Sequence, residues 1–142
     1  MRLDPDLIFR LANGVALLAW VALAFSPGGA RWSATVRRVT GRWLPLALAV
    51  CYVALLWTHW PAQGGFGSVA DVQTLFQSPG ALVAGWVHYL AFDLFVGSWI
   101  AERAAALEMH HALLLPVLLL TFLFGPAGWQ AFAVLKPKGS LS

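Results

Sequence analysis

Two ionisable side chains lie inside an apolar stretch of the chain, in the segment GWVHYLAFDLFVGSWIAER at residues 85–103. If this segment is a membrane helix, His88 and Asp93 both lie well inside the hydrocarbon layer. An aspartate near the bilayer centre costs on the order of 2.5–3.5 kcal/mol, so it must face other helices and either find a partner or carry a proton. A protonated carboxyl group can donate a proton and a neutral imidazole can accept one, so these residues are the candidate catalytic pair. A structural contact between helices is the alternative for Asp93.

Helical spacing sorts the residues around Asp93 into two stripes. The first contains Trp86, Tyr89, Asp93, Gly97 and Ile100, which repeat at three and four residues. The second contains His88, Phe92, Phe95, Trp99 and Glu102, about 140° further round the helix. Gly97 leaves room for another helix or a ligand one turn from Asp93. The aromatic side chains of the second stripe fit packing or lipid contact as well as they fit a ligand. His88 and Asp93 are about 7.5 Å apart along the axis, so they could touch two ends of one reacting group but not each other.

The composition places the chain among membrane proteins. Of its 142 residues, 60% are apolar and 11% are charged, which is too apolar for an ordinary soluble domain. Four segments approach the roughly 20 residues that a membrane helix needs, and they are residues 5–25, 43–60, 80–103 and 110–135. We therefore predict one all-α membrane domain over residues 1–142, a bundle of four transmembrane helices. The segment at residues 63–80 is too polar to span, and the spacing of its apolar residues predicts a short interfacial helix or a lid.

The net charge of +3 does not indicate a nucleic-acid partner. Arg31, Arg37, Arg38 and Arg42 lie together in the predicted connection between the first two helices, where basic residues are typical of a cytoplasmic membrane loop. With Arg103, five basic residues fall on that side and four on the other, which favours both termini outside by one residue.

The third and fourth predicted helices should form an antiparallel hairpin that turns at residues 104–109. This register sets Asp93 level with Leu120 or Thr121, close enough for a hydrogen bond from Thr121, and sets His88 beside the helix break at Gly125. A carboxyl group, an imidazole and irregular backbone would then surround one apolar cavity, which suits a lipophilic substrate. The candidate substrate-binding residues are Trp86, Tyr89, Gly97, Thr121 and Gly125.

A metal centre built from histidines and a carboxylate is the main alternative to acid–base chemistry. The candidate ligands are His59, His88, Glu102, His110 and His111. On a straight helix His88 and Glu102 lie about 21 Å apart, beyond the reach of one metal ion. Glu102, His110 and His111 can meet at one end of the bundle, but no HExxH-like spacing supports a site there. We therefore predict no single metal centre.

The segments at residues 84–103 and 110–129 carry a resemblance to a known family. Over residues 79–129 the chain resembles the abscisic-acid-deficient-4-like family of small membrane proteins, whose plant members are required to make neoxanthin from violaxanthin. The most specific matches are Trp86, His88, Leu90, Asp93, Leu94, Phe95, His111 and the FGPAG segment at residues 124–128. The resemblance implies a carotenoid-linked function. The plant conversion turns an epoxide into an allenic alcohol without net redox change, which requires a proton donor and a proton acceptor.

Three functions follow as expectations. The first is a membrane enzyme that modifies a carotenoid or other isoprenoid, by isomerisation without a cofactor or by oxidative cleavage with a metal such as iron. The second is a non-catalytic carotenoid-binding or assembly partner, and the third is a small proton-coupled carrier with Asp93 as its protonation site. The expected partners are membrane lipid and a lipophilic substrate, with a homo-oligomer or other carotenoid enzymes left open. We expect a bacterial member, located in the inner membrane.

Overall fold

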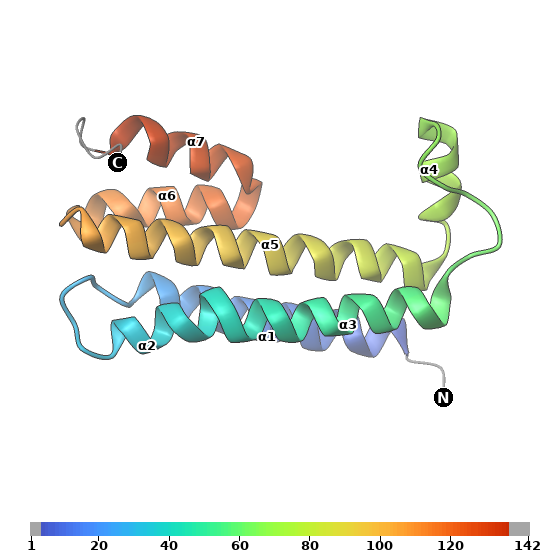
Figure 1. Ribbon diagram of the computed structural model, residues 1–142, viewed down its shortest axis with the longest axis horizontal. Helices are drawn as coiled ribbons and strands as arrows, with labels where there is room; N and C mark the ends of the chain where they lie inside the picture. Colours follow the sequence, from blue (N-terminus) through green and yellow to red (C-terminus); the bar gives the residue numbers. More distant parts are fainter. Residues whose placement is uncertain (1–3, 137–142) are drawn as a thin grey trace.

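The helix that carries Asp93 lies at the centre of the bundle. This helix, α5 (Pro79–Ala106), contacts the helices on either side of it, and 50% of its most apolar 18-residue stretch is buried. The corresponding buried share is 28% for Pro5–Ala24 and 17% for Ser33–His59. The computed structural model describes residues 4–136, and Figure 1 shows its long helical segments running side by side along its longest axis.

The described chain is all helical. Its elements are α1 (Pro5–Ala24), α2 (Ser33–Arg38), the π-helical turn η1 (Val39–Trp43), α3 (Leu44–His59), α4 (Val69–Leu75), α5, α6 (His111–Phe124) and α7 (Pro126–Leu135), with no strand within residues 4–136. Three segments are long and apolar enough to cross a membrane: Pro5–Ala24, Ser33–His59 and Pro79–Ala106. The all-α class is therefore confirmed, whereas the fourth predicted transmembrane helix takes a different form.

A capping side chain followed by proline begins both α1 and α5. Asp4 accepts a hydrogen bond from the backbone N–H of Asp6 at 3.0 Å, and Pro5 opens α1. Ser78 accepts from the backbone N–H of Ala81 at 3.5 Å, and Pro79 opens α5. A capping side chain followed by proline satisfies the free donors of a first helical turn and suits its backbone angles.

The basic segment between the first two spans is helical, where the sequence predicted a connecting loop. α2, η1 and α3 form one helical run over Ser33–His59, so the predicted helix at 43–60 begins ten residues earlier. Pro45 explains the π turn, because a proline ring clashes with the carbonyl group four residues before it, here that of Gly41. The wider turn at Val39–Trp43 relieves this clash without ending the helix.

Residues 110–135 form two short helices in place of one span. α6 ends at Phe124, Gly125 follows with φ +38, and α7 turns back along α6 (Figure 1). Gly128 packs directly on Thr121, an approach that a larger side chain would block. Pro116 stays within α6 without ending it, so the break expected at Gly125-Pro126 is the one that reverses the chain. At about 21 Å, α6 is too short to cross a layer of about 30 Å.

Figure 1 shows that α1 begins and α7 ends at opposite ends of the bundle, whereas four spans would place both on one side. We call the end that holds α4 the α4 end. We call the other end, where α1 and α5 finish, the arginine end. Of the seven described Lys and Arg residues, six belong to it: Arg31, Arg37, Arg38, Arg42, Arg103 and Lys136. Arg2 and Lys138 lie outside the described residues.

Two apolar clusters hold the bundle together. One joins α1 and α5 to the hairpin through residues such as Leu23, Ile100 and Phe132. The other joins α1 and α5 to α3 through residues such as Leu55 and Val87. The hairpin therefore supports only the half of α5 nearer the arginine end. The short helix predicted at residues 63–80 is present as α4, and Figure 1 shows it standing across the bundle axis.

Candidate functional site

Asp93 lies midway along α5 and its carboxyl group packs against the break between α6 and α7. A Cβ atom added to Gly125 would lie 2.5 Å from Oδ1 and 3.3 Å from Oδ2 of Asp93. The Oδ2 atom is buried and has no hydrogen-bond partner among residues 4–136. Buried polar atoms are nearly always hydrogen-bonded, so this oxygen is the clearest unsatisfied polar group in the middle of the bundle.

The observed register of α5 against the α6–α7 hairpin differs from the predicted one. Gly125 lies beside Asp93, whereas the sequence placed it beside His88. The reason is the length of α5, which continues to Ala106, followed by a turn in which Glu108 has φ 53 and α6 begins at His111. Because the turn lies later in the chain than expected, the hairpin residues beside Asp93 also lie later.

Aromatic side chains extend the Asp93 face toward the α4 end. Tyr89 neighbours the Asp93 carboxyl group, and its hydroxyl group donates to the Leu123 carbonyl oxygen at 3.4 Å. Trp86 packs on Tyr89 with ring centroids 5.4 Å apart. Its indole N–H donates to Asn13 Oδ1 at 3.0 Å, so α1 also contributes to the site.

Asn13 was not among the residues that the sequence pointed to. It is a polar residue on an apolar helix, and its amide N–H also donates to the Phe9 carbonyl oxygen at 2.8 Å. Phe9 in turn lies 5.8 Å from Trp86 between ring centroids. A polar residue within a membrane helix was a usable signal for Asn13, whereas its pairing with Trp86 depends on how α1 and α5 pack.

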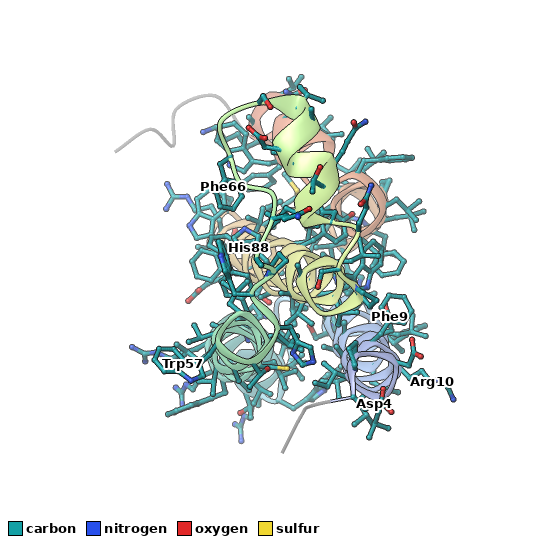
Figure 2. All side chains as sticks on the ribbon, turned by 90° about the vertical axis from the view of Figure 1, so that its right-hand side faces the viewer. Asp4, Phe9, Arg10, Trp57, Phe66 and His88 are labelled. Carbon is teal, nitrogen blue, oxygen red and sulfur yellow. The ribbon has the colours of Figure 1, made fainter. Side chains whose placement is uncertain are left out.

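His88 lies on a different face of α5 from Asp93. Its ring packs on Tyr52 of α3 at 5.3 Å and on Phe92 at 4.7 Å between centroids. Figure 2, viewed from the α4 end, shows His88 on one side of the bundle and Phe9, the neighbour of Trp86, on the other. The two residues predicted as a catalytic pair therefore do not share a cavity.

Two further residues of the predicted site pack within the protein. Gly97 receives the ring of Trp20 from α1, so a neighbouring helix occupies the space that a ligand could have used. The hydroxyl group of Thr121 is buried and donates to the Val117 carbonyl oxygen at 2.8 Å, where the sequence predicted a bond to Asp93. Both residues shape the bundle around Asp93.

The five candidate metal ligands are dispersed. His59 packs on Gly80 at the α4 end, while His110 caps α6 by accepting from the backbone N–H of Ala112 at 3.3 Å. His111 Nε2 contacts the Ala24 carbonyl oxygen at 2.8 Å and so acts as the donor there. Within residues 4–136, no three His, Cys, Asp or Glu side chains gather as a metal site.

Five surface cavities of the described chain lie elsewhere than the apolar cavity expected around His88 and Asp93. None of their linings includes His88, Tyr89, Asp93 or Gly125. The Asp93 site is instead an open face, because the hairpin ends beside Asp93 and leaves Trp86 40% exposed and Leu82 54% exposed. In a membrane this face would contact lipid.

Comparison with known proteins agrees with the resemblance seen in the sequence. The model of the family described as ABA DEFICIENT 4-like (ABA4-like) matches residues 7–132, which extend from α1 into α7 and include Asp93, Tyr89 and Gly125. No curated protein and no solved structure matches the chain. The chain belongs to the ABA DEFICIENT 4-like family, which implies a membrane protein with a role connected to carotenoids and neoxanthin.

Proposed function

We propose that the protein binds a carotenoid or a related isoprenoid along the open face of α5 and acts on its polar end at Asp93. This face begins at Leu82 and Trp86 near the α4 end and stops where the hairpin meets Asp93. A long apolar molecule dissolved in the membrane can reach it sideways without passing through water. Aromatic rings along the face supply apolar contact area for a polyene chain.

The observation that carries the proposal is the unpaired Oδ2 atom of Asp93. It is buried beside the hairpin tip and has no hydrogen-bond partner in the described chain. Rotation of the half-buried Asp93 side chain would bring this oxygen to a polar group of a ligand on the open face, where a hydroxyl can donate to a carboxylate and an epoxide oxygen can accept from a carboxylic acid. Asp93 therefore provides one polar contact at the end of an apolar binding face, as is usual for lipophilic ligands.

Isomerisation of an epoxide fits this arrangement with Asp93 as the acid. A protonated Asp93 would donate its proton to the epoxide oxygen as a C–O bond breaks, and the resulting carboxylate would accept a proton from the polyene chain. The atoms balance without an oxidant or a reductant. Tyr89 would position the ligand oxygen beside Asp93, and His88 takes no part because it faces α3.

Binding without catalysis is the second function that a specific observation favours. The separation of His88 and Asp93 onto different faces of α5 removes the acid–base pair that the sequence predicted. A protein that stores or delivers a carotenoid needs only the open face and one polar contact. In that case Asp93 would hold the ligand without changing it.

Pigment analysis in carotenoid-producing bacterial cells tests the proposal. Cells expressing the wild type, Asp93→Asn, Tyr89→Phe or His88→Ala are compared by chromatography and mass spectrometry, with membrane levels checked by blot. We expect a new or depleted carotenoid with the wild type and with His88→Ala, its loss with Asp93→Asn, and a reduced yield with Tyr89→Phe.

Pigment that copurifies with the protein separates the two functions. If no strain changes its carotenoids but the wild type retains pigment that Asp93→Asn loses, the protein binds without catalysis. If Asp93→Asn matches the wild type in both measurements, neither function resides at Asp93 and the proposal fails.

A further inference from the structure

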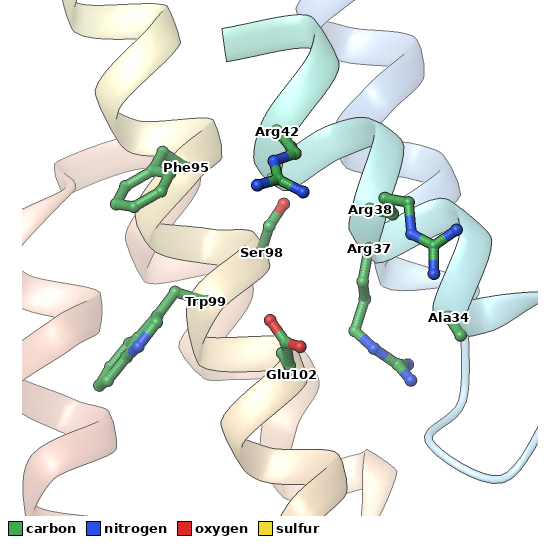
Figure 3. Close-up of a pocket in the computed structure, with 9 residues that line it drawn as sticks. Ala34, Arg37, Arg38, Arg42, Phe95, Ser98, Trp99 and Glu102 are labelled. Carbon is green, nitrogen blue, oxygen red and sulfur yellow. The ribbon is translucent and has the colours of Figure 1, made fainter. Parts of the chain in front are cut away.

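A polar pocket of about 360 Å³ opens at the arginine end, between the α2–η1 helix and α5. Figure 3 shows Arg37, Arg38 and Arg42 on one side of it and Ser98 and Glu102 of α5 on the other. Glu102 is nine residues beyond Asp93, which places it about 180° round the helix. The pocket therefore lies on the opposite side of α5 from the Asp93 face.

The π turn brings the arginines together. Arg37 and Arg42 are five residues apart, and a regular α-helix would separate their side chains by about 140°. The hydrogen bonds of a π-helix join residues five apart, so η1 rotates Arg42 toward the side of Arg37. Such turns are frequent at functional sites.

Close packing fixes the position of this turn against α5. A Cβ atom added to Gly41 would lie 2.9 Å from the Cβ of Ser98. The hydroxyl group of Ser98 donates to Thr40 Oγ1 at 2.7 Å, and both side chains are buried. The walls of the pocket are therefore held in place by a buried hydrogen bond and a close helix contact.

The charges in the pocket lack ion-pair partners in the described chain. Within residues 4–136, no carboxylate forms an ion pair with Arg37, Arg38 or Arg42, and Glu102 faces them without one. Three guanidinium groups against one carboxylate leave an excess of positive charge. Guanidinium groups match phosphate in geometry and charge, so the pocket favours a phosphate group.

An apolar groove of about 370 Å³ continues from the pocket along α3 and α5. The pocket and the groove share Gly41, Arg42 and Phe95. The rest of the groove is lined by Pro45, Leu46, Ala49, Ala91 and Phe92. A charged recess that joins an apolar channel matches a molecule with a charged head and a hydrocarbon chain.

We propose that the pocket and groove bind one anionic phospholipid, with its phosphate at the three arginines and an acyl chain in the groove. Glu102 repels a bare phosphate but accepts a hydrogen bond from a headgroup hydroxyl, which favours phosphatidylglycerol over phosphatidic acid. The site uses none of the residues assigned to the carotenoid face, so it does not depend on the proposed function.

Native mass spectrometry of the full-length protein in detergent tests the site with phosphatidylglycerol, phosphatidic acid and phosphatidylcholine. We expect the wild type to retain phosphatidylglycerol best, and Arg42→Gln to weaken its retention roughly tenfold. Arg31→Gln is the matched control, because Arg31 is exposed at the same end and does not line the pocket. Arg38→Gln removes an exposed charge and repeats the test if Arg42→Gln lowers the helical circular dichroism.

Two further arms separate a lipid from free phosphate. Ala49→Trp fills the groove and should abolish lipid retention, and inorganic phosphate should not displace the lipid from the wild type. Glu102→Gln should remove the preference for phosphatidylglycerol over phosphatidic acid. Equal losses in Arg42→Gln and Arg31→Gln would show general attraction to the basic end and overturn the proposal. Displacement by inorganic phosphate, with Ala49→Trp behaving as the wild type, would identify a free-phosphate site and overturn it as well.

Discussion

The two sides of α5 carry polar groups in opposite ways. On one side Asp93 lies at mid-length beside Tyr89, packed against the hairpin tip and flanked by aromatic rings. On the other side Arg37, Arg38 and Arg42 line a pocket opposite Glu102 near one end of the bundle. Charges near a membrane surface can extend to water, whereas a carboxyl group at mid-depth must be covered by protein or by a ligand. We therefore expect an apolar ligand on the Asp93 side and lipid headgroups on the arginine side.

The two sites are also held by different kinds of contact. The arginines all lie on the α2–η1 part of one helical run, whose π turn sets their spacing. Asp93 depends on Gly125, which comes from a distant part of the chain through the α6–α7 hairpin. A change in the hairpin should therefore disturb the Asp93 side far more than the arginine side.

Measuring both the carotenoid change and lipid retention in one variant of each site should show the largest effect. We expect Asp93→Asn to abolish the carotenoid change while retaining phosphatidylglycerol as the wild type does. We expect Arg42→Gln to show the reverse pattern, because the two side chains lie on opposite sides of α5. Pigment chromatography and native mass spectrometry of the same two preparations check this. Loss of both readouts in either variant would mean that the sites are coupled.

Labelling of single cysteines should show an equally clear difference between the ends of the chain. In a Cys51→Ser background, Lys136→Cys and Arg31→Cys should react with an impermeant maleimide from the same side of the membrane, and Asp6→Cys from the other. We expect the arginine end to face the cytoplasm, because basic residues are in excess there. If Lys136→Cys labels together with Asp6→Cys, residues 111–135 form a full crossing in the membrane and the hairpin does not persist there.

Gly125→Ala should destabilise the protein by about 1–3 kcal/mol, because φ +38 is unfavourable for alanine and the new Cβ meets Asp93. It should also reduce the carotenoid change. Gly14→Ala is the control, since nothing lies within 4 Å of its added Cβ and alanine favours a helix. Thermal unfolding in detergent measures both variants, and equal midpoints for them would contradict the observed contact.

Ser98→Ala should have the smallest effect. It removes the buried hydrogen bond to Thr40 and should lower the free energy of unfolding by about 1 kcal/mol. Because this bond joins η1 to α5, phosphatidylglycerol retention should weaken while the carotenoid change persists. Unfolding of Thr40→Val, Ser98→Ala and the double variant measures the coupling. Additive effects in the double variant would show that the bond contributes nothing.

Much of the fold could be predicted from local patterns. The apolar runs, the Asp4-Pro5 and Ser78-Pro79 starts and the break at Gly125-Pro126 all appear in the structure. The helical state of residues 33–43 was missed because a basic segment between apolar runs is typical of a loop. The reversal of the chain at Gly125 was missed because a glycine followed by proline predicts a kink and a full turn equally well.

Local patterns in the chain were enough to predict that Asp93 lies inside an apolar helix and that Tyr89 and Trp86 share its stripe, since helical periodicity follows from local geometry. The residues that meet there follow from the tertiary structure. It moved Gly125 to Asp93, turned His88 toward α3, filled Gly97 with Trp20 and brought Asn13 to Trp86. These outcomes depend on the length of α5 and the return of α7 along α6, which are set by packing across the bundle.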